Sequence, residues 1–170
     1  MLNKQQLKKL IEENKLVENY IDLETQLTPN GFDLTAAEIY EFCGAGAVDF
    51  SNKERVLCPV RKIEPVKNDY ADEFGWWQLK AGAYKVKTNE TVNMPNNLIA
   101  TASTRTTLLR MGAHTSHGIW DAGFCGKSEF LLIVENTNGV LIKQNARVAQ
   151  LMFLPAQETE SYEGIYKNLK

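Results

Sequence analysis

The chain has 170 residues, 44% of them hydrophobic, so it is long enough for one domain with a substantial core. Its 19 basic and 21 acidic residues nearly balance, which excludes the strong positive field that recruits nucleic acid or an anionic membrane. No apolar run reaches the length that spans a bilayer, and the first residues lack the apolar core of a signal peptide. We therefore expect a soluble, cytoplasmic protein with one domain over residues 1–170.

The N-terminal segment, residues 1–19, predicts a short amphipathic helix over residues 3–18. Asn3 and Gln6 have the spacing of a capping box. One apolar face is marked by Leu7, Leu10, Ile11 and Val17. After this helix the spacing of the apolar residues changes. Apolar and polar residues alternate from Ile21 to Leu27, which predicts a strand that ends at a Pro-Asn-Gly turn.

Short alternating or apolar runs continue along the rest of the chain, and we expect strands there. These runs cover residues 32–34, 76–79, 84–88, 98–101, 130–134, 140–142 and 148–154. Residues 43–75 predict hairpins and loops, and the polar segment 156–170 predicts a mobile tail that serves as a lid. Many short strands after one helix predict a mainly β fold, either a barrel or a sandwich.

The three cysteines, Cys43, Cys58 and Cys125, are odd in number and never spaced as Cys-x-x-Cys. This pattern indicates reduced thiols of an intracellular protein rather than a disulfide framework or a zinc site. His114 and His117 suggest a metal site through their spacing, but a third ligand is missing from the sequence nearby. We therefore favour histidines that lie in a polar or buried loop.

A glycine-punctuated stretch, residues 115–127, places Asp121 between the aromatic residues Trp120 and Phe124. A lone carboxylate in such a stretch is a candidate general base if a substrate binds beside it. The alternative is a glycine-rich turn that enters a buried strand, with Asp121 bonded to its own backbone. The residues of this stretch alone leave both interpretations open.

A second informative stretch, residues 103–112, concentrates guanidinium and hydroxyl groups. These groups belong to Ser103, Thr104, Arg105, Thr106, Thr107 and Arg110. Arginine forks and hydroxyls suit the oxygens of a polyphosphate. The alternative is an amphipathic turn whose leucines face the core while its arginines pair with surface acids. The sequence has no Walker A motif, which excludes a P-loop.

Five motifs in a fixed order resemble the dUTPase and dCTP deaminase superfamily, and the fourth is most similar to archaeal-type dUTPases. They are Gly31-Phe-Asp-Leu34, Thr88-x-Glu90 with Pro95, Ser103-Thr-Arg-Thr-Thr-Leu-Leu-Arg110, Trp120-Asp-Ala-Gly-Phe-x-Gly126 and Ala146-Arg-Val-Ala-Gln-Leu151. The resemblance implies a distorted β-barrel of the dUTPase-like, β-clip type. It also implies a homotrimer with active sites where subunits meet.

The resemblance also implies a role for individual residues. Asp121 matches the carboxylate that activates water for attack on the α-phosphorus of deoxyuridine triphosphate (dUTP), which yields dUMP and pyrophosphate. Phe124 matches the aromatic residue under the sugar, and the main chain of residues 131–134 would read the uracil. Mg²⁺ would be held through phosphates and waters. The implied substrate-binding set is Arg105, Thr106, Thr107, Arg110, Phe124 and Gln150.

The superfamily contains a second chemistry, the deamination of dCTP, which uses a glutamate on the strand after the aspartate loop. Counted from Asp121 without gaps, that position is Leu131, which cannot move protons. Glu129 lies two residues earlier on the same strand face and Glu135 four residues later, so a register shift would restore a deaminase or a bifunctional enzyme. The tail also resembles that of deaminases. An alternative of another class is a non-catalytic nucleotide-binding β module.

Overall fold

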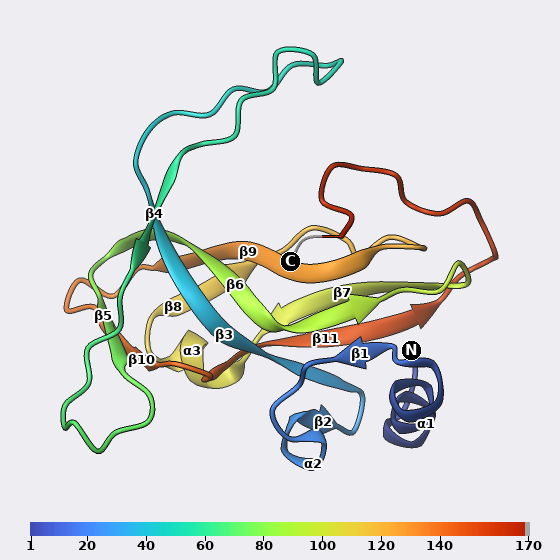
Figure 1. The fold of residues 1–170 in the computed structure, drawn as a ribbon, viewed down its shortest axis with the longest axis horizontal. Coiled ribbons are helices and arrows are strands. Elements are labelled where there is room, and N and C mark those ends of the chain that lie inside the picture. The colour runs from blue at the N-terminus through green and yellow to red at the C-terminus, as the bar shows by residue number, and fades with distance from the viewer. Residues whose placement is uncertain (169–170) are drawn as a thin grey trace.

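The computed structural model describes residues 1–168. Their main element is a nine-stranded antiparallel sheet that curls into a nearly closed barrel (Figure 1). The helices are α1 (Lys4–Asn14), α2 (Leu23–Gln26) and α3 (Thr106–Arg110). The strands are β1 (Val17–Glu18), β2 (Leu27–Thr28), β3 (Gly31–Phe42), β4 (Val60–Ile63), β5 (Trp76–Leu79), β6 (Gly82–Asn93), β7 (Leu98–Thr104), β8 (Ala113–Ser116), β9 (Cys125–Val134), β10 (Val140–Lys143) and β11 (Arg147–Pro155). The expected mainly β, barrel-like fold with one leading helix is confirmed.

The main path of the sheet runs β7-β11-β3-β6-β9-β8, and its two outer strands approach each other. Thr104, the last residue of β7, accepts a hydrogen bond through its hydroxyl from the N–H of Thr115 in β8 at 2.9 Å. The strands β1, β2 and β4 extend this sheet, whereas β5 and β10 form a separate two-stranded ribbon. A side-chain bond thus helps to close the barrel where the strand ladder stops.

The capping box predicted at Asn3 and Gln6 is confirmed, and both of its hydrogen bonds are 3.0 Å long. The predicted end of the helix at residue 18 is wrong. Lys15 adopts a left-handed conformation that ends α1, and the following β1 pairs with β6. No helix within residues 1–168 has the length and apolar character needed to cross a membrane. The cytoplasmic location expected from the sequence stays a prediction.

The strand predicted over residues 21–27 is also wrong, because most of this segment forms the short helix α2. Asp22 caps the helix by accepting a hydrogen bond from the Thr25 N–H at 2.7 Å. The side-chain oxygen of Gln26 accepts from the N–H groups of Ile21 and Asp22 at 2.7 and 3.0 Å. These local side-chain bonds override the alternating apolar pattern.

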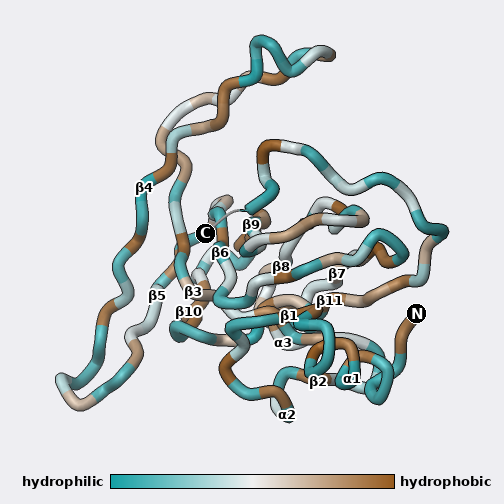
Figure 2. Tube along the Cα trace, turned by 45° about the vertical axis from the view of Figure 1, so that its right-hand side comes forward, coloured by the Kyte–Doolittle hydropathy of each residue, from teal (hydrophilic) through white to brown (hydrophobic). Residues whose placement is uncertain are grey.

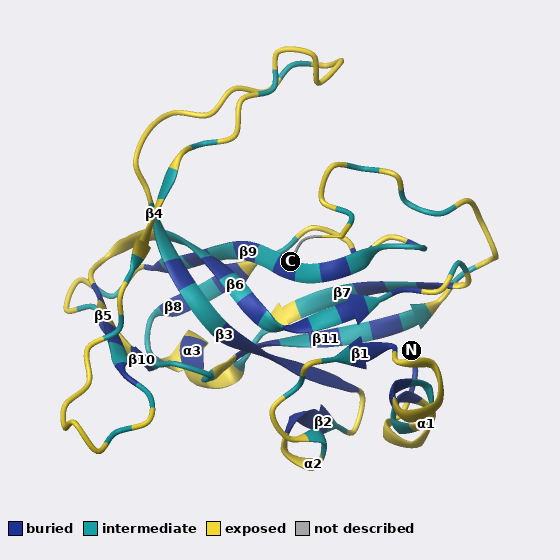
Figure 3. Cartoon of the chain, viewed as in Figure 1, coloured by how far each residue is buried: buried dark blue, intermediate teal, exposed yellow. Residues whose placement is uncertain are grey.

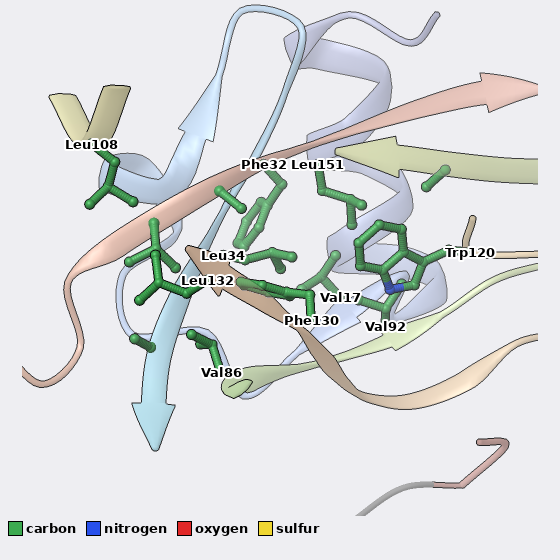
Figure 4. Close-up of a cluster of buried hydrophobic side chains, with 14 of the residues drawn as sticks. Val17, Phe32, Leu34, Val86, Val92, Leu108, Trp120, Phe130, Leu132 and Leu151 are labelled. Carbon is green, nitrogen blue, oxygen red and sulfur yellow. The ribbon is translucent and has the colours of Figure 1, made fainter. Parts of the chain in front are cut away.

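The core fills the barrel with alternate residues of its strands (Figure 4). In β9 the side chains of Phe130, Leu132 and Val134 are buried, whereas those between them are only half-buried. Figure 4 shows Phe130 and Leu132 beside Leu34 and Val86 of neighbouring strands. This alternation fixes which residues of β9 face outward, and those outward residues form part of the site described below.

A buried polar network ties β3 to β6 inside the barrel wall. The Glu90 carboxylate accepts hydrogen bonds from the N–H of Thr35 at 3.0 Å, the hydroxyl of Thr35 at 2.5 Å and the amide of Gln26 at 2.7 Å. Burial raises the pKa of Glu90, and the three donors oppose that shift. The Gln26 amide also donates to the carbonyl of Asp33 at 2.9 Å, so the network positions the part of β3 that carries Asp33.

Two segments project from the barrel between β3 and β5, where the sequence predicted hairpins and loops (Figure 1). We call residues 43–59 the arm; it leaves the end of β3 and returns through β4, which pairs with β3. Residues 64–75 form the second projecting loop, and both segments are largely exposed (Figure 3).

Candidate active site

Asp121 lies in the loop that joins β8 to β9, and its neighbour Trp120 fixes this loop to the barrel. The backbone of Trp120 exchanges two hydrogen bonds of 2.9 Å with Ala100 in β7. The indole N–H of Trp120 donates to the Ser128 hydroxyl at 2.8 Å. Trp120 is buried and Asp121 is exposed. The buried indole therefore anchors the segment and leaves the adjacent carboxylate at the surface.

Asp121 and Phe124 line a cavity of about 500 Å³ that lies against the outer face of β9. Part of the apolar wall comes from Leu57 of the arm and from Phe42 and Val60, the strand residues on either side of the arm. Most of the wall is apolar, with a small number of charged groups. A concave site of this kind suits a small organic ligand that is oriented by few polar contacts.

Two side chains of opposite charge, Lys85 and Glu129, lie on the sheet wall of this cavity. The Lys85 ammonium donates to Glu129 Oε1 at 2.9 Å, and each side chain is 24% exposed. Lys85 Nζ also lies 4.7 Å from the centroid of the Tyr40 ring. Burial, assisted by the Glu38 carboxylate, raises the pKa of Tyr40 to about 12, so this ring stays neutral. The Lys85–Glu129 pair gives the cavity a donor and an acceptor without net charge.

Leu131 follows Glu129 on the same face of β9, as the sequence predicted, and both line the cavity. Glu135, by contrast, lies beyond the end of β9 at an exposed position, and its Oε1 is 4.0 Å from His114 Nδ1. Glu129 is therefore the glutamate that this strand places beside Asp121. The position that the deaminase resemblance would require to be acidic carries an apolar side chain.

The main chain of residues 131–134 is not free to contact a ligand, contrary to our expectation. Leu131 pairs with Lys85 of β6 on one side and with Ser116 of β8 on the other, and this double pairing continues to the end of β9. In the described chain, residues 125–130 have only β6 as a strand neighbour. The part of the β9 main chain that a ligand can reach is therefore the earlier part of the strand.

Arg105 and Arg147 form a second cluster around Asp33, a carboxylate of β3. Asp33 Oδ2 forms an ion pair with Arg105 and another with Arg147 Nη1 at 3.2 Å. The Asp33 side chain is 1% exposed, whereas those of Arg105 and Arg147 are 27% and 37% exposed. Burial and then the charge of Arg147 lower the pKa of Arg105. Pairing with Asp33 holds the two guanidiniums next to each other at the surface.

Other predicted residues lie near this cluster. Gln150 pairs with Asp33 in the sheet register, and its amide donates to Thr28 Oγ1 at 2.6 Å. Three more follow Arg105 at exposed positions of α3, namely Thr106, Thr107 and Arg110. Arg147 was not among the predicted site residues, although the fifth motif contains it. Its partner Asp33 is 114 positions away in the sequence, so their pairing has no local signal.

The predicted site residues fall into two groups. Asp121 and Phe124 line the cavity, but Arg105, Gln150 and the polar residues of α3 do not. Trp120 is bridged to Ala100, and Arg105, directly after the end of β7, lies five residues beyond Ala100, which corresponds to roughly 16 Å of strand. One copy of the chain therefore presents a carboxylate beside a cavity and, at some distance, a set of guanidiniums and hydroxyls.

The C-terminal segment contacts the barrel through a few of its residues, while its expected mobility and its role as a lid stay predictions. The Tyr162 N–H donates to the Ala122 carbonyl at 2.8 Å, and the Ser161 hydroxyl donates to Asn96 Oδ1 at 2.8 Å. The Tyr162 ring lies 6.0 Å from the Phe124 ring and lines the cavity. Residues 169 and 170 of the expected tail lie outside the described residues.

His117 packs against the aromatic residues behind the cavity. Its ring centroid lies 4.7 Å from that of Phe130 and 5.9 Å from that of Trp120. Burial lowers the pKa of His117 to about 4, so the ring is neutral at physiological pH. Across residues 1–168 there is no group of three or more His, Cys, Asp or Glu side chains with the arrangement of a metal site.

Known proteins resemble this chain over most of its length. A family model described as dCTP deaminase-like matches residues 1–156. A Methanosarcina barkeri protein named "Probable deoxyuridine 5'-triphosphate nucleotidohydrolase" is 46% identical over 171 residues, which cover 99% of this chain and 96% of the relative. An Archaeoglobus fulgidus protein of the same name is 40% identical over 168 residues, which cover 98% and 95%.

A solved structure supports the fold. The crystal structure of 2'-deoxycytidine 5'-triphosphate deaminase from Agrobacterium tumefaciens matches with a TM-score of 0.62 at 16% identity, over 89% of this chain. The chain spans about half of that protein, 47% of its length, so this likeness concerns the fold alone. From the family model and the full-length relatives together, the chain belongs to the dCTP deaminase-like family.

Proposed function

We propose that this protein hydrolyses dUTP to dUMP and pyrophosphate. The observation that carries the proposal is the cavity beside Asp121, whose wall has Leu131 where the deaminase resemblance would require a glutamate. The two full-length archaeal relatives, named as nucleotidohydrolases of deoxyuridine 5'-triphosphate, support the same reaction.

In this reaction Asp121 takes a proton from the water that attacks the α-phosphorus. Its exposed carboxylate at the cavity edge suits that role, and a general base of this kind contributes ~10² to 10⁴-fold to the rate. Phe124 packs under the deoxyribose and leaves no space for a ribose 2'-hydroxyl. The uracil ring of the nucleotide occupies the cavity, where the accessible main chain of β9 and the Lys85–Glu129 pair offer hydrogen-bonding groups.

The guanidinium cluster binds the triphosphate and offsets the charge that develops on the departing pyrophosphate. Arg105 and Arg147 are already held side by side by Asp33, so little side-chain ordering is needed when the anion binds. The hydroxyls and free N–H groups at the start of α3 add donors for the same oxygens. The phosphate-binding residues are therefore Arg105, Thr106, Thr107, Arg110 and Gln150, joined by Arg147.

Mg²⁺ is the proposed cofactor. Mg²⁺ is commonly bound through one or two carboxylates together with substrate phosphates and waters, so an ion held mainly by the triphosphate needs few protein ligands. Asp121 is the residue of the cavity that would contact such an ion through water. When bound, the ion supplies neutralisation of the phosphate charge.

A second copy of the chain completes the site in this proposal, within a homotrimer. The roughly 16 Å of strand between the Trp120 bridge and Arg105 separates the base from its phosphate-binding partners within one copy. Mixing two inactive variants, Asp121→Asn and Arg105→Ala, tests the idea. Shared sites regain part of the activity after subunit exchange, whereas a site confined to one copy regains none.

Product analysis separates the proposed reaction from its alternatives. The protein is incubated with Mg²⁺ and either dUTP or dCTP, and dUMP, pyrophosphate and ammonia are measured. We expect pyrophosphate and dUMP from dUTP and no ammonia from dCTP. Release of ammonia would identify a deaminase or a bifunctional enzyme, and binding without any product would identify a non-catalytic nucleotide-binding module.

A further inference from the structure

The arm, residues 43–59, is an ordered ribbon that extends away from the barrel (Figures 1 and 3). Ala47 and Val56 face each other across it and exchange two backbone hydrogen bonds of 2.9 Å. At its tip the Asp49 carboxylate accepts from the N–H groups of Ser51 and Glu54 at 3.0 and 3.1 Å. These bonds give the arm a defined shape of its own.

Exposed apolar side chains concentrate on the arm. Figure 2 colours parts of its trace as hydrophobic. Phe50 is 105% exposed and Val48 is 83% exposed, and both Val56 and Leu57 are more than half exposed. Exposed apolar groups that gather on one segment in this way are typical of interaction surfaces. In one isolated chain these apolar side chains stay in water, so they contribute no burial free energy to the stability of the fold.

We propose that the arm binds a second copy of this chain and holds it against the cavity that contains Asp121. Leu57 of the arm already forms part of the cavity wall, together with Phe42 and Val60, the strand residues that flank the arm. A copy that brings its Arg105 cluster to this cavity must lie beside that wall, which places it within reach of the arm. The choice of this partner rests on the proposed function, because only the shared site requires the second copy.

The charges of the arm favour a protein partner over a polyanion. Asp49 and Glu54 balance Lys53 and Arg55, so the arm has no basic surface for nucleic acid. The contact joins the arm of one copy to a different surface of the next. Such a head-to-tail contact closes into a ring when the rotation between copies allows it, which is compatible with the expected trimer.

The test removes the apolar groups at the tip and leaves the barrel unchanged. The double variant Val48→Ser/Phe50→Ser is compared with Tyr70→Ser, which removes an equally exposed aromatic residue (104%) from the other projecting loop. Molar mass is measured by light scattering over a dilution series, and circular dichroism checks the fold. We expect the double variant to dissociate at protein concentrations at least ~10-fold higher than wild type or the control.

Activity gives a second measurement on the same samples. The specific dUTP hydrolysis rate of the double variant should fall on dilution and recover at high concentration, while the control follows wild type. The proposal is overturned if wild type is a monomer at all concentrations, or if the double variant matches wild type in mass. A different outcome would separate the two proposals. If the double variant dissociates more readily than wild type but wild type hydrolyses no nucleotide, the arm contact is supported and the proposed function is rejected.

Discussion

Asp33 is the residue on which the geometry of the guanidinium cluster depends. Its carboxylate is 1% exposed and pairs with both Arg105 and Arg147. The substitution Asp33→Asn keeps the shape of the side chain but removes the negative charge between two positive ones. The two guanidiniums would then repel each other without a counter-charge. We expect a lower free energy of unfolding and weaker binding of the triphosphate.

The size of the stability loss follows from the exposure of the three groups. Removing one partner from a fully buried ion pair costs roughly 3–5 kcal/mol, because the other charge is left without compensation. Here the arginines that remain are 27% and 37% exposed, so water can solvate them in part. The asparagine also retains one acceptor oxygen. We therefore expect the free energy of unfolding to fall by about 2 kcal/mol.

Urea denaturation at one fixed protein concentration measures this loss, since assembly contributes to the apparent stability. The matched control is Glu41→Gln, which breaks an exposed ion pair with Arg61 of 2.6 Å and should cost no more than ~1 kcal/mol. If Asp33→Asn is no more destabilising than Glu41→Gln, the buried carboxylate does not hold the cluster. A KM for dUTP that stays unchanged in Asp33→Asn would contradict the proposed role of the cluster in binding.

Three further predictions concern the base, the core and the buried histidine. Asp121→Asn should lower kcat for dUTP by ~10² to 10⁴-fold while calorimetry finds dUTP binding nearly unchanged, and near-normal hydrolysis would remove Asp121 from the mechanism. Leu132→Ala should lower the free energy of unfolding by about 3 kcal/mol, against less than ~1 kcal/mol for the exposed Leu141→Ala; equal losses would contradict the core assignment. Because burial lowers the folded-state pKa of His117 from 6.5 to about 4, the unfolded chain binds more protons in this range, and stability should fall as the pH drops from 6.5 to 4 by up to about 3 kcal/mol. His117→Gln should flatten that decline in denaturation curves, and an unchanged slope would show that His117 is not its source.

The parts of the fold that depend on local pattern could be predicted. The capping box at Asn3 was correct because its hydrogen bonds connect residues three apart. The prediction that Glu129 and Leu131 share one face of β9 was correct, because successive side chains of any strand point to opposite faces. The mainly β, barrel-like fold follows from many such short segments. Each of these inferences needs only neighbours along the chain.

The errors came from interactions that the local pattern does not contain. Residues 21–27 alternate like a strand, but Asp22 and Gln26 bond to nearby backbone groups and form a helix. The main chain of residues 131–134 looked available, yet β8 covers it through a pairing between distant segments. Spatial arrangement, rather than residue type, was the missing information.

The position of one carboxylate along β9 is the structural argument for proposing one of the two chemistries of the superfamily over the other. Glu129 and Leu131 share a face, but two residues along a strand are separated by ~7 Å. A general base acts across a hydrogen bond of ~3 Å, so Glu129 cannot take over the role of a glutamate at position 131 without a change of register. The register is fixed on both edges of β9 at Leu131, by Lys85 and by Ser116. The sheet pairing therefore opposes the register shift that would bring Glu129 to that position, and this is a physical reason for proposing hydrolysis at Asp121 rather than deamination.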